Sequence, residues 1–211
     1  MNAIHIRHRY EPKLEVTAFE GHFATRHSHN SHYIDITRMK HEHTMAREAA
    51  VDLAQRYTYE KGVDTIVCLD GSEVIGAFLA RHLAKKDYFN VNSDKNINVI
   101  TPEYDSNGQL IFRENLVPMV AGKDILVLIS TVNSGKTISR CLECVQYYGG
   151  KIQGIAAVFS VLQQVGEIPV YSLFAPEDIP GYSTHSPKEC PMCRAGQKID
   201  GLSNSYGFSK L

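Results

Sequence analysis

Residues 123–149 read KDILVLISTVNSGKTISRCLECVQYYG, and this stretch decides the fold. Its first part is a continuous apolar run, which predicts a strand buried on both faces of a parallel sheet. Its second part repeats apolar residues at the spacing of an amphipathic helix. Those residues are Ile138, Cys141, Leu142, Val145 and Tyr148. The residues between the two parts are therefore predicted to form a short strand-to-helix turn.

A turn of this kind is suited to binding phosphate. It directs free backbone N–H groups and the positive end of a helix dipole toward one point. Gly135 lets the chain approach a ligand closely. Lys136 lies in the first helical turn, where a cation opposes the dipole unless an anion offsets it. We therefore predict a phosphate-binding loop; for Lys136 itself, a side chain that points into water is the alternative.

The same loop nearly fits the pattern G-x-x-x-x-G-K-[ST] of nucleoside-triphosphate hydrolases. Ser130 stands where the first glycine of that pattern belongs, and that glycine lets the backbone wrap the β-phosphate. Downstream, the run KIQGIAAVFS at 151–160 carries no acidic residue that could bind magnesium. The sequence therefore disfavours, without removing, a P-loop NTPase.

Bulk properties limit the class of protein. The 211 residues are enough for one α/β core with a small accessory piece, and the formal net charge of −1 does not favour binding to a nucleic-acid polymer or an anionic membrane. No apolar run reaches the ~20 residues of a membrane span, and the first residues lack the apolar region of a signal peptide, which predicts a cytoplasmic protein. Five cysteines favour reduced thiols or a metal site over a disulfide framework.

The remaining pattern alternates between strands and helices. Helices are expected at 44–60 and 74–84, and strands at 63–69, near 101, and within 151–162 and 169–174. This alternation predicts a doubly wound, mostly parallel sheet with ligands at the carboxyl ends of its strands. We place this α/β core at 41–174. The histidine-rich, partly β segment 1–40 and the Pro, Gly and Ser-rich tail 175–211 are predicted to be accessory.

Several segments in order resemble one enzyme family. VDTIVCLDGSEVIGAFLA at 63–80, the long polar segment that begins at Glu103, ILVLISTVNSGKTI at 125–138 and HSPKECPMCRAGQKI at 185–199 together are similar to the type I phosphoribosyltransferases, especially their orotate branch. The resemblance covers residues 30–200. It implies that the two accessory segments form a hood over the core, and that the protein is a homodimer which transfers phosphoribose from phosphoribosyl pyrophosphate, with magnesium, to a nucleobase.

The resemblance also assigns roles to residues. Asp70 and Gly71 would contact pyrophosphate, and Arg113 is the one cation of the lid segment 103–116 that could stabilise its departure. The ribose 5′-phosphate would be held by Asn133, Ser134, Gly135, Lys136 and Thr137.

The sequence departs from the family at positions that matter for catalysis. Ile129 and Ser130 replace the two adjacent acids that bind the ribose hydroxyls, and Asn133 replaces an acid that can take part in proton transfer. Losing one charge-stabilising group commonly costs ~3 kcal/mol in the transition state. Three interpretations stay open: an enzyme with altered metal handling, a non-catalytic sensor of phosphoribosyl ligands, or an enzyme for another phosphorylated sugar or nucleotide.

The tail carries a candidate metal site. Cys190 and Cys193 have the spacing of a zinc knuckle, and His185 could supply a third ligand. Histidines of the N-terminal segment, or Cys68, could complete the site; the alternative is two packed thiols without metal. Cys141 and Cys144 have the same spacing but lie in the predicted helix, where core thiols are expected. The histidines His27, His29 and His32 either line the hood or titrate in a solvated loop.

Overall fold

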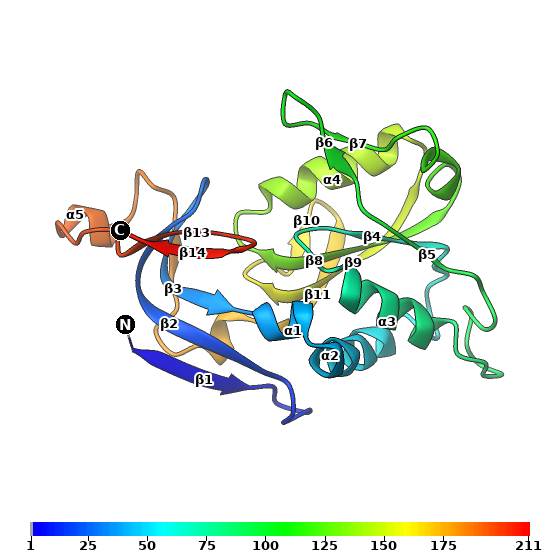
Figure 1. Cartoon of the computed structure of the whole chain (residues 1–211), viewed down its shortest axis with the longest axis horizontal. Coiled ribbons are helices and arrows are strands. Elements are labelled where there is room, and N and C mark those ends of the chain that lie inside the picture. Colours follow the sequence, from blue (N-terminus) through cyan, green and yellow to red (C-terminus); the bar gives the residue numbers. More distant parts are fainter. Residues whose placement is uncertain (1) are drawn as a thin grey trace.

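The computed structural model describes residues 2–211. Met1, the first residue of the predicted hood, is the only residue outside the described range. Two six-stranded sheets form two neighbouring bodies (Figure 1). We call them the core sheet and the hood sheet. No helix in residues 2–211 is both long and apolar enough to cross a bilayer.

The core sheet has the strand order β10-β11-β9-β8-β4-β5. Every neighbouring pair from β11 to β5 is parallel, and only β10 joins antiparallel. The predicted mostly parallel sheet is therefore confirmed. The strand bounds are β4 Thr65–Cys68, β5 Asn98–Ile100, β8 Asp124–Val132, β9 Lys151–Ser160, β10 Gln164–Val165 and β11 Ile168–Phe174.

Helices cover both faces of the core sheet (Figure 1). On one face lie α2 (His43–Gln55) and α3 (Glu73–Leu83), preceded by the short α1 (Thr37–His41). On the other face lies α4 (Lys136–Tyr147). Residues of α2 and α3 contribute to one apolar cluster and those of α4 to a second, because a strand buried on both faces sends alternate side chains to each. The arrangement is doubly wound, as predicted.

The hood sheet joins segments from both ends of the chain (Figure 1). Its order is β12-β3-β2-β13-β14, with β1 paired to β2. The short helix α5 (Pro191–Arg194) lies between β12 and β13. The strands are β1 Ala3–Arg7, β2 Glu15–Ala24, β3 His29–Asp35, β12 Thr184–His185, β13 Gly201–Asn204 and β14 Gly207–Lys210. The domain boundaries proposed above stay a prediction.

The polar segment after β5 is not wholly irregular. It contains a small antiparallel hairpin of β6 (Glu103–Tyr104) and β7 (Leu110–Ile111), followed by the 3-10 turn Val117–Met119. Two-residue strands are too short to show periodicity in the sequence, so the hairpin was not predicted. A second 3-10 turn, Pro176–Asp178, follows β11 and leads into the tail.

Candidate functional site

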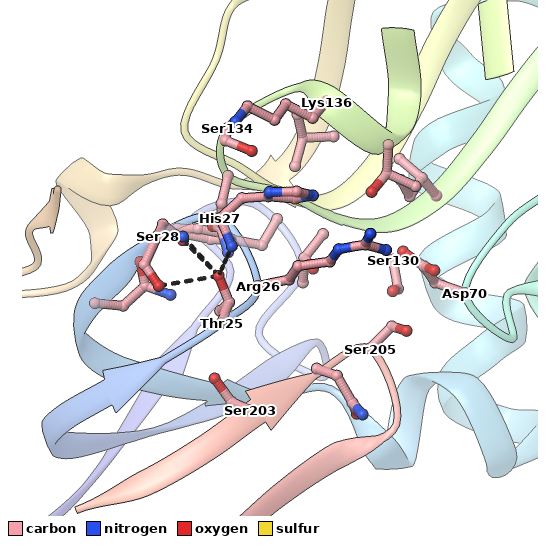
Figure 2. Close-up of a pocket in the computed structure, with 18 of the residues that line it drawn as sticks. Thr25, Arg26, His27, Ser28, Asp70, Ser130, Ser134, Lys136, Ser203 and Ser205 are labelled. Atoms are coloured by element: carbon pink, nitrogen blue, oxygen red, sulfur yellow. Dashed lines mark hydrogen bonds between the residues drawn. The ribbon is translucent and has the colours of Figure 1, made fainter. Parts of the chain in front are cut away.

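A cavity of about 290 Å³ opens between the hood and the carboxyl end of β8. Its walls are the loop from β8 to α4, the hood loop 25–28 and the hood turn 203–205 (Figure 2). All of the predicted phosphate-binding residues line it, namely Asn133, Ser134, Gly135, Lys136 and Thr137. The structure thus brings this predicted set together at one cavity.

The loop leaves backbone donors free at the start of α4. Gly135 is the residue before the helix and has a φ of 76°, a left-handed conformation that favours glycine. Ser139 donates the first helical hydrogen bond, to the Gly135 carbonyl at 2.9 Å. Amides of the first turn have no partner within a helix, and no side chain of residues 2–211 caps this one. The first-turn amides are therefore available to an anion in the cavity.

The side chains beside the loop are also arranged around the cavity. The Tyr182 hydroxyl donates to Asn133 Oδ1 at 3.3 Å, which orients that amide. Ser130 is fully buried and lines the cavity, yet its Oγ is the one buried side-chain N or O atom in residues 2–211 without a hydrogen-bond partner. A buried hydroxyl without a partner is costly, so a water molecule or a polar ligand group that bonds to Ser130 Oγ would remove this cost.

Cations from both bodies surround the loop. Arg26 and His27 of the hood and Lys136 and Arg140 of α4 all line the cavity. The pKa of His27 lies below its usual value because of partial burial and then because of the nearby charges of Lys136, Arg26 and Arg140. Lys136, Arg26 and Arg140 thus place positive charge around the loop, which favours an anionic ligand.

Sequence analysis missed Arg26 and Arg140. Arg140 stands one helical turn after Lys136, a spacing that places both on one face of α4 and could have indicated its role. Arg26 had no such signal, because its position depends on how the hood folds over the core.

Asp70 lies at the far side of the cavity from Lys136 (Figure 2). Its φ of 58° is unusual for a residue other than glycine and marks a tight turn after β4. Burial raises the pKa of its carboxyl group, while a hydrogen bond from Ser205 and the charge of Lys40 act in the opposite direction. Lys40 is itself buried and donates to the Ser205 carbonyl at 2.7 Å.

The other two predicted residues of this region lie outside the cavity lining within the described chain. A Cβ at Gly71 would come 3.0 Å from Cε of Lys40, so Gly71 packs against that side chain. Arg113 is more than half exposed, and its guanidinium pairs with Glu103 at 2.9 Å across the β6–β7 hairpin. Arg113 thus lies outside the cavity lining, and its predicted catalytic role would require it to move toward the cavity.

A second cluster of functional side chains lies in the hood. Cys190 and Cys193 come together with His22 and His29, and one donor atom of each lies within 4.8 Å of all the others. His185, the third metal ligand predicted from the sequence, is not part of this cluster. It stays in β12, paired with β3, whereas the chain after it turns back toward β2. The N-terminal histidines considered as further ligands are thus the ones beside the cysteines.

Comparisons with known proteins agree with this architecture. No protein-family model matches the chain. Curated relatives include an orotate phosphoribosyltransferase of Chlorobium phaeobacteroides, 24% identical over 86% of each chain, and one of Caldicellulosiruptor bescii, 24% identical over 85% of this chain and 87% of the relative. Among solved structures, an adenine phosphoribosyltransferase of Thermoanaerobacter pseudethanolicus superposes with a TM-score of 0.52 and 13% identity, covering 82% of this chain and 95% of that one.

The structural likeness establishes the fold, and the sequence likeness is to orotate phosphoribosyltransferases, the branch expected from the motifs. The chain is orotate phosphoribosyltransferase-like in sequence and has the fold of the type I phosphoribosyltransferases.

Proposed function

We propose that this protein binds a phosphoribosyl ligand, either phosphoribosyl pyrophosphate or a nucleotide 5′-phosphate, and transfers its phosphoribosyl group to a nucleobase. The observation that carries the proposal is the β8–α4 loop, whose first-turn amides, hydroxyls and lysine all line one cavity. A dianionic phosphate matches such a set of donors at a helix N-terminus. The curated relatives named orotate phosphoribosyltransferase support the choice of reaction.

The reaction would proceed by displacement at C1 of the ribose. A ring nitrogen of the base forms the new C1–N bond, the C1–O bond to pyrophosphate breaks, and pyrophosphate leaves with the bonding electrons. The nitrogen of the base gives up its proton, which the departing pyrophosphate or water takes up. The protein's task is to stabilise negative charge on the leaving oxygens with donors that are already in place. The Arg26 side chain extends from the hood toward Ser130 and Asp70 in Figure 2, so it is suited to that role.

The residues present fit a resident magnesium ion poorly. Magnesium is usually held by one or two carboxylates together with substrate phosphates. Asp70 is the only carboxylate that lines the cavity in residues 2–211; burial raises its pKa, and Lys40 lies beside it. Ile129 and Ser130 supply no charge. We infer that the cation Arg26 does part of the work that magnesium does in related sites, and that any magnesium arrives with pyrophosphate.

The homodimer implied by the family resemblance and the cytoplasmic location predicted from the sequence stay predictions. So does the expectation that neither a nucleic-acid polymer nor a membrane is a partner.

Calorimetric titration with phosphoribosyl pyrophosphate, with and without magnesium, tests binding. We expect saturable binding in both conditions, with less than a tenfold change in affinity on adding magnesium. Release of pyrophosphate is then measured with each common base in turn. Binding and release together support the enzyme; binding without release assigns the protein as a phosphoribosyl-ligand sensor, and no binding rejects the proposal.

Substitution of Arg26 distinguishes binding of the pyrophosphate group from binding of the ribose 5-phosphate group. Arg26→Ala should weaken binding of inorganic pyrophosphate by about tenfold to a hundredfold, because a charge-assisted hydrogen bond contributes about 1.5–3 kcal/mol. Binding of ribose 5-phosphate, which the β8–α4 loop holds, should change by less than threefold. Arg7→Ala on the hood strand β1, whose side chain is exposed, is the matched control. Equal losses for both ligands would contradict the assignment.

A further inference from the structure

The His22, His29, Cys190 and Cys193 cluster is unrelated to phosphate binding and has the composition of a zinc site. Four donor atoms of thiol and imidazole type are what structural zinc sites use. His22 Nε2 lies 3.0 Å from His29 Nδ1 and 3.6 Å from both cysteine sulfurs, and Cys193 Sγ lies 3.2 Å from His29 Nδ1. The four donors therefore converge on one point from separate parts of the hood.

These separations fit a tetrahedron around zinc. With Zn–N bonds of about 2.0–2.1 Å and Zn–S bonds of about 2.3 Å, the edges of the tetrahedron are about 3.3–3.8 Å. Four of the six edges measure 3.0–3.6 Å, and the other two, from Cys190 Sγ to Cys193 Sγ and to His29, are no longer than 4.8 Å, so adjustments of the side chains would accommodate an ion.

The surroundings of His22 fix the ring in the form a metal needs. Its Nδ1 lies 3.1 Å from the Gln197 carbonyl, so Nδ1–H donates to that oxygen and the lone pair of Nε2 faces His29 and the thiols. The backbone amide of His22 donates to Asp200 Oδ2 at 2.7 Å. Ligating histidines characteristically have such an outer hydrogen bond, which sets both tautomer and orientation. Tail residues 197 and 200 thus position the ligand.

Burial also favours a bound ion. His22 and Cys190 are fully buried and His29 is 9% exposed. Polar donors are seldom gathered in this way without a ligand, since their desolvation must be compensated. Only Cys193 is exposed, which gives an ion a route of entry.

We propose that His22, His29, Cys190 and Cys193 form a structural zinc site that fastens the C-terminal tail to the β2–β3 hairpin. All four positions are filled by protein, so the ion has no open position for a substrate and no catalytic role. The hood sheet is small and assembled from both ends of the chain, and a cross-link of this kind would stabilise it strongly.

The site also has a consequence for the cavity, which rests on the proposed function. His22 and His29 flank the hood loop 25–28, in which Thr25 Oγ accepts hydrogen bonds from the amides of His27 and Ser28 (Figure 2). That loop places Arg26 and His27 at the cavity. Zinc would hold both ends of the loop, so removing zinc should weaken phosphoribosyl-ligand binding without any contact between the ion and the ligand.

Metal content is measured first, by elemental analysis of protein produced without a polyhistidine tag. We expect about one zinc per chain. Cys190→Ser and Cys193→Ser should each lower the zinc content at least tenfold. Two matched controls should keep it: Cys144→Ser, from the other C-x-x-C pair, and His185→Asn, which removes the histidine outside the cluster. Substitution with Co²⁺ should give the intense visible absorption of a tetrahedral site with thiolate ligands.

The wild-type protein decides the matter even if the cysteine variants fail to fold. Wild type that contains no zinc and takes up neither Zn²⁺ nor Co²⁺ in titration would overturn the site. So would full zinc content in a folded Cys190→Ser protein, or loss of zinc in His185→Asn. Zinc binding with no effect of chelation on ligand affinity would keep the structural site and reject its link to loop 25–28. Zinc binding without any ligand binding would reject the proposed function alone.

Discussion

The phosphate loop of the core and the histidine-cysteine cluster of the hood are both groups of ligating atoms, but they are assembled in different ways. The loop uses five consecutive residues, 133–137, positioned by the strand before them and the helix after them. The cluster uses residues 22, 29, 190 and 193, which meet only when both ends of the chain enter one sheet. A local site can be derived from a short stretch of sequence; a site of distant residues requires the tertiary structure.

The two C-x-x-C pairs show the same contrast. Cys141 and Cys144 lie on α4 facing the core, where burial raises both pKa values, that of Cys144 to about 11. Cys144 Sγ donates to the Leu110 carbonyl at 3.2 Å, so it behaves as a packed thiol, as the sequence predicted. Cys190 and Cys193 instead face two imidazoles. Equal spacing gives different chemistry because the neighbours differ.

The largest effect is expected from Gly135→Val, which changes the phosphate loop. Its φ of 76° disfavours any side chain, at a cost of about 1–2 kcal/mol, and a Cβ would lie 2.9 Å from Leu162 Cδ1. With overpacking of about 1–3 kcal/mol, urea unfolding should show about 2–5 kcal/mol less stability. Calorimetry should show no binding of phosphoribosyl pyrophosphate. The loss of stability is larger than the sequence alone suggests, because Leu162 is not adjacent in the chain.

Gly166→Val is the matched control for the backbone conformation. Gly166 also has a positive φ, of 60°, but nothing lies within 4 Å of its added Cβ. It should lose about 1–2 kcal/mol of stability and keep its ligand affinity. Retained binding in Gly135→Val would contradict the close approach of the loop to the ligand. Equal destabilisation of the two variants would contradict the close packing of Gly135 against Leu162.

Lys136→Ala should have the next largest effect, and on binding alone. Removing one charge-assisted hydrogen bond should weaken ribose 5-phosphate binding by about tenfold to a hundredfold, since such a bond contributes about 1.5–3 kcal/mol. Stability should not fall, because a lysine in the first turn opposes the helix dipole. Lys151→Ala, at the exposed start of β9, is the control. An unchanged affinity would show that Lys136 points into water, the alternative that the sequence left open.

How far the sequence could predict the molecule follows the same division. The β8–α4 unit and the parallel order could be predicted because burial on both faces and helical periodicity are local signals. The pairing of β13 with β2 and the approach of Arg26 to the loop could not, because β13 has only four residues and the partners are distant in sequence. The sequence suggested His185 as the third metal ligand for the same reason. His185 is near Cys190 in sequence, whereas His22 is near it in space.

The pH dependence of stability tests the packing of the hood at His32, which lies outside the histidine-cysteine cluster. Burial lowers the pKa of His32 below the unfolded value of 6.5, with Glu20 opposing this. As the pH falls below about 6.5, the unfolded chain takes up the proton before the folded one, so stability falls and then levels off below the folded pKa. His32→Gln should reduce this decline in urea unfolding measured between pH 7.5 and pH 5 relative to wild type. Equal declines would show that His32 is not buried as described.

The smallest effect is expected from Arg113→Ala. The Arg113–Glu103 pair is exposed on both sides, and such pairs contribute about 0–1 kcal/mol, so urea unfolding should change by less than about 0.5 kcal/mol. Ligand affinity should be unchanged, because the guanidinium lies outside the cavity lining. Glu103→Ala, which frees Arg113, serves as the comparison. If Arg113→Ala instead lowers pyrophosphate release tenfold while affinity stays constant, the hairpin closes during turnover and Arg113 has the catalytic role that the sequence predicted.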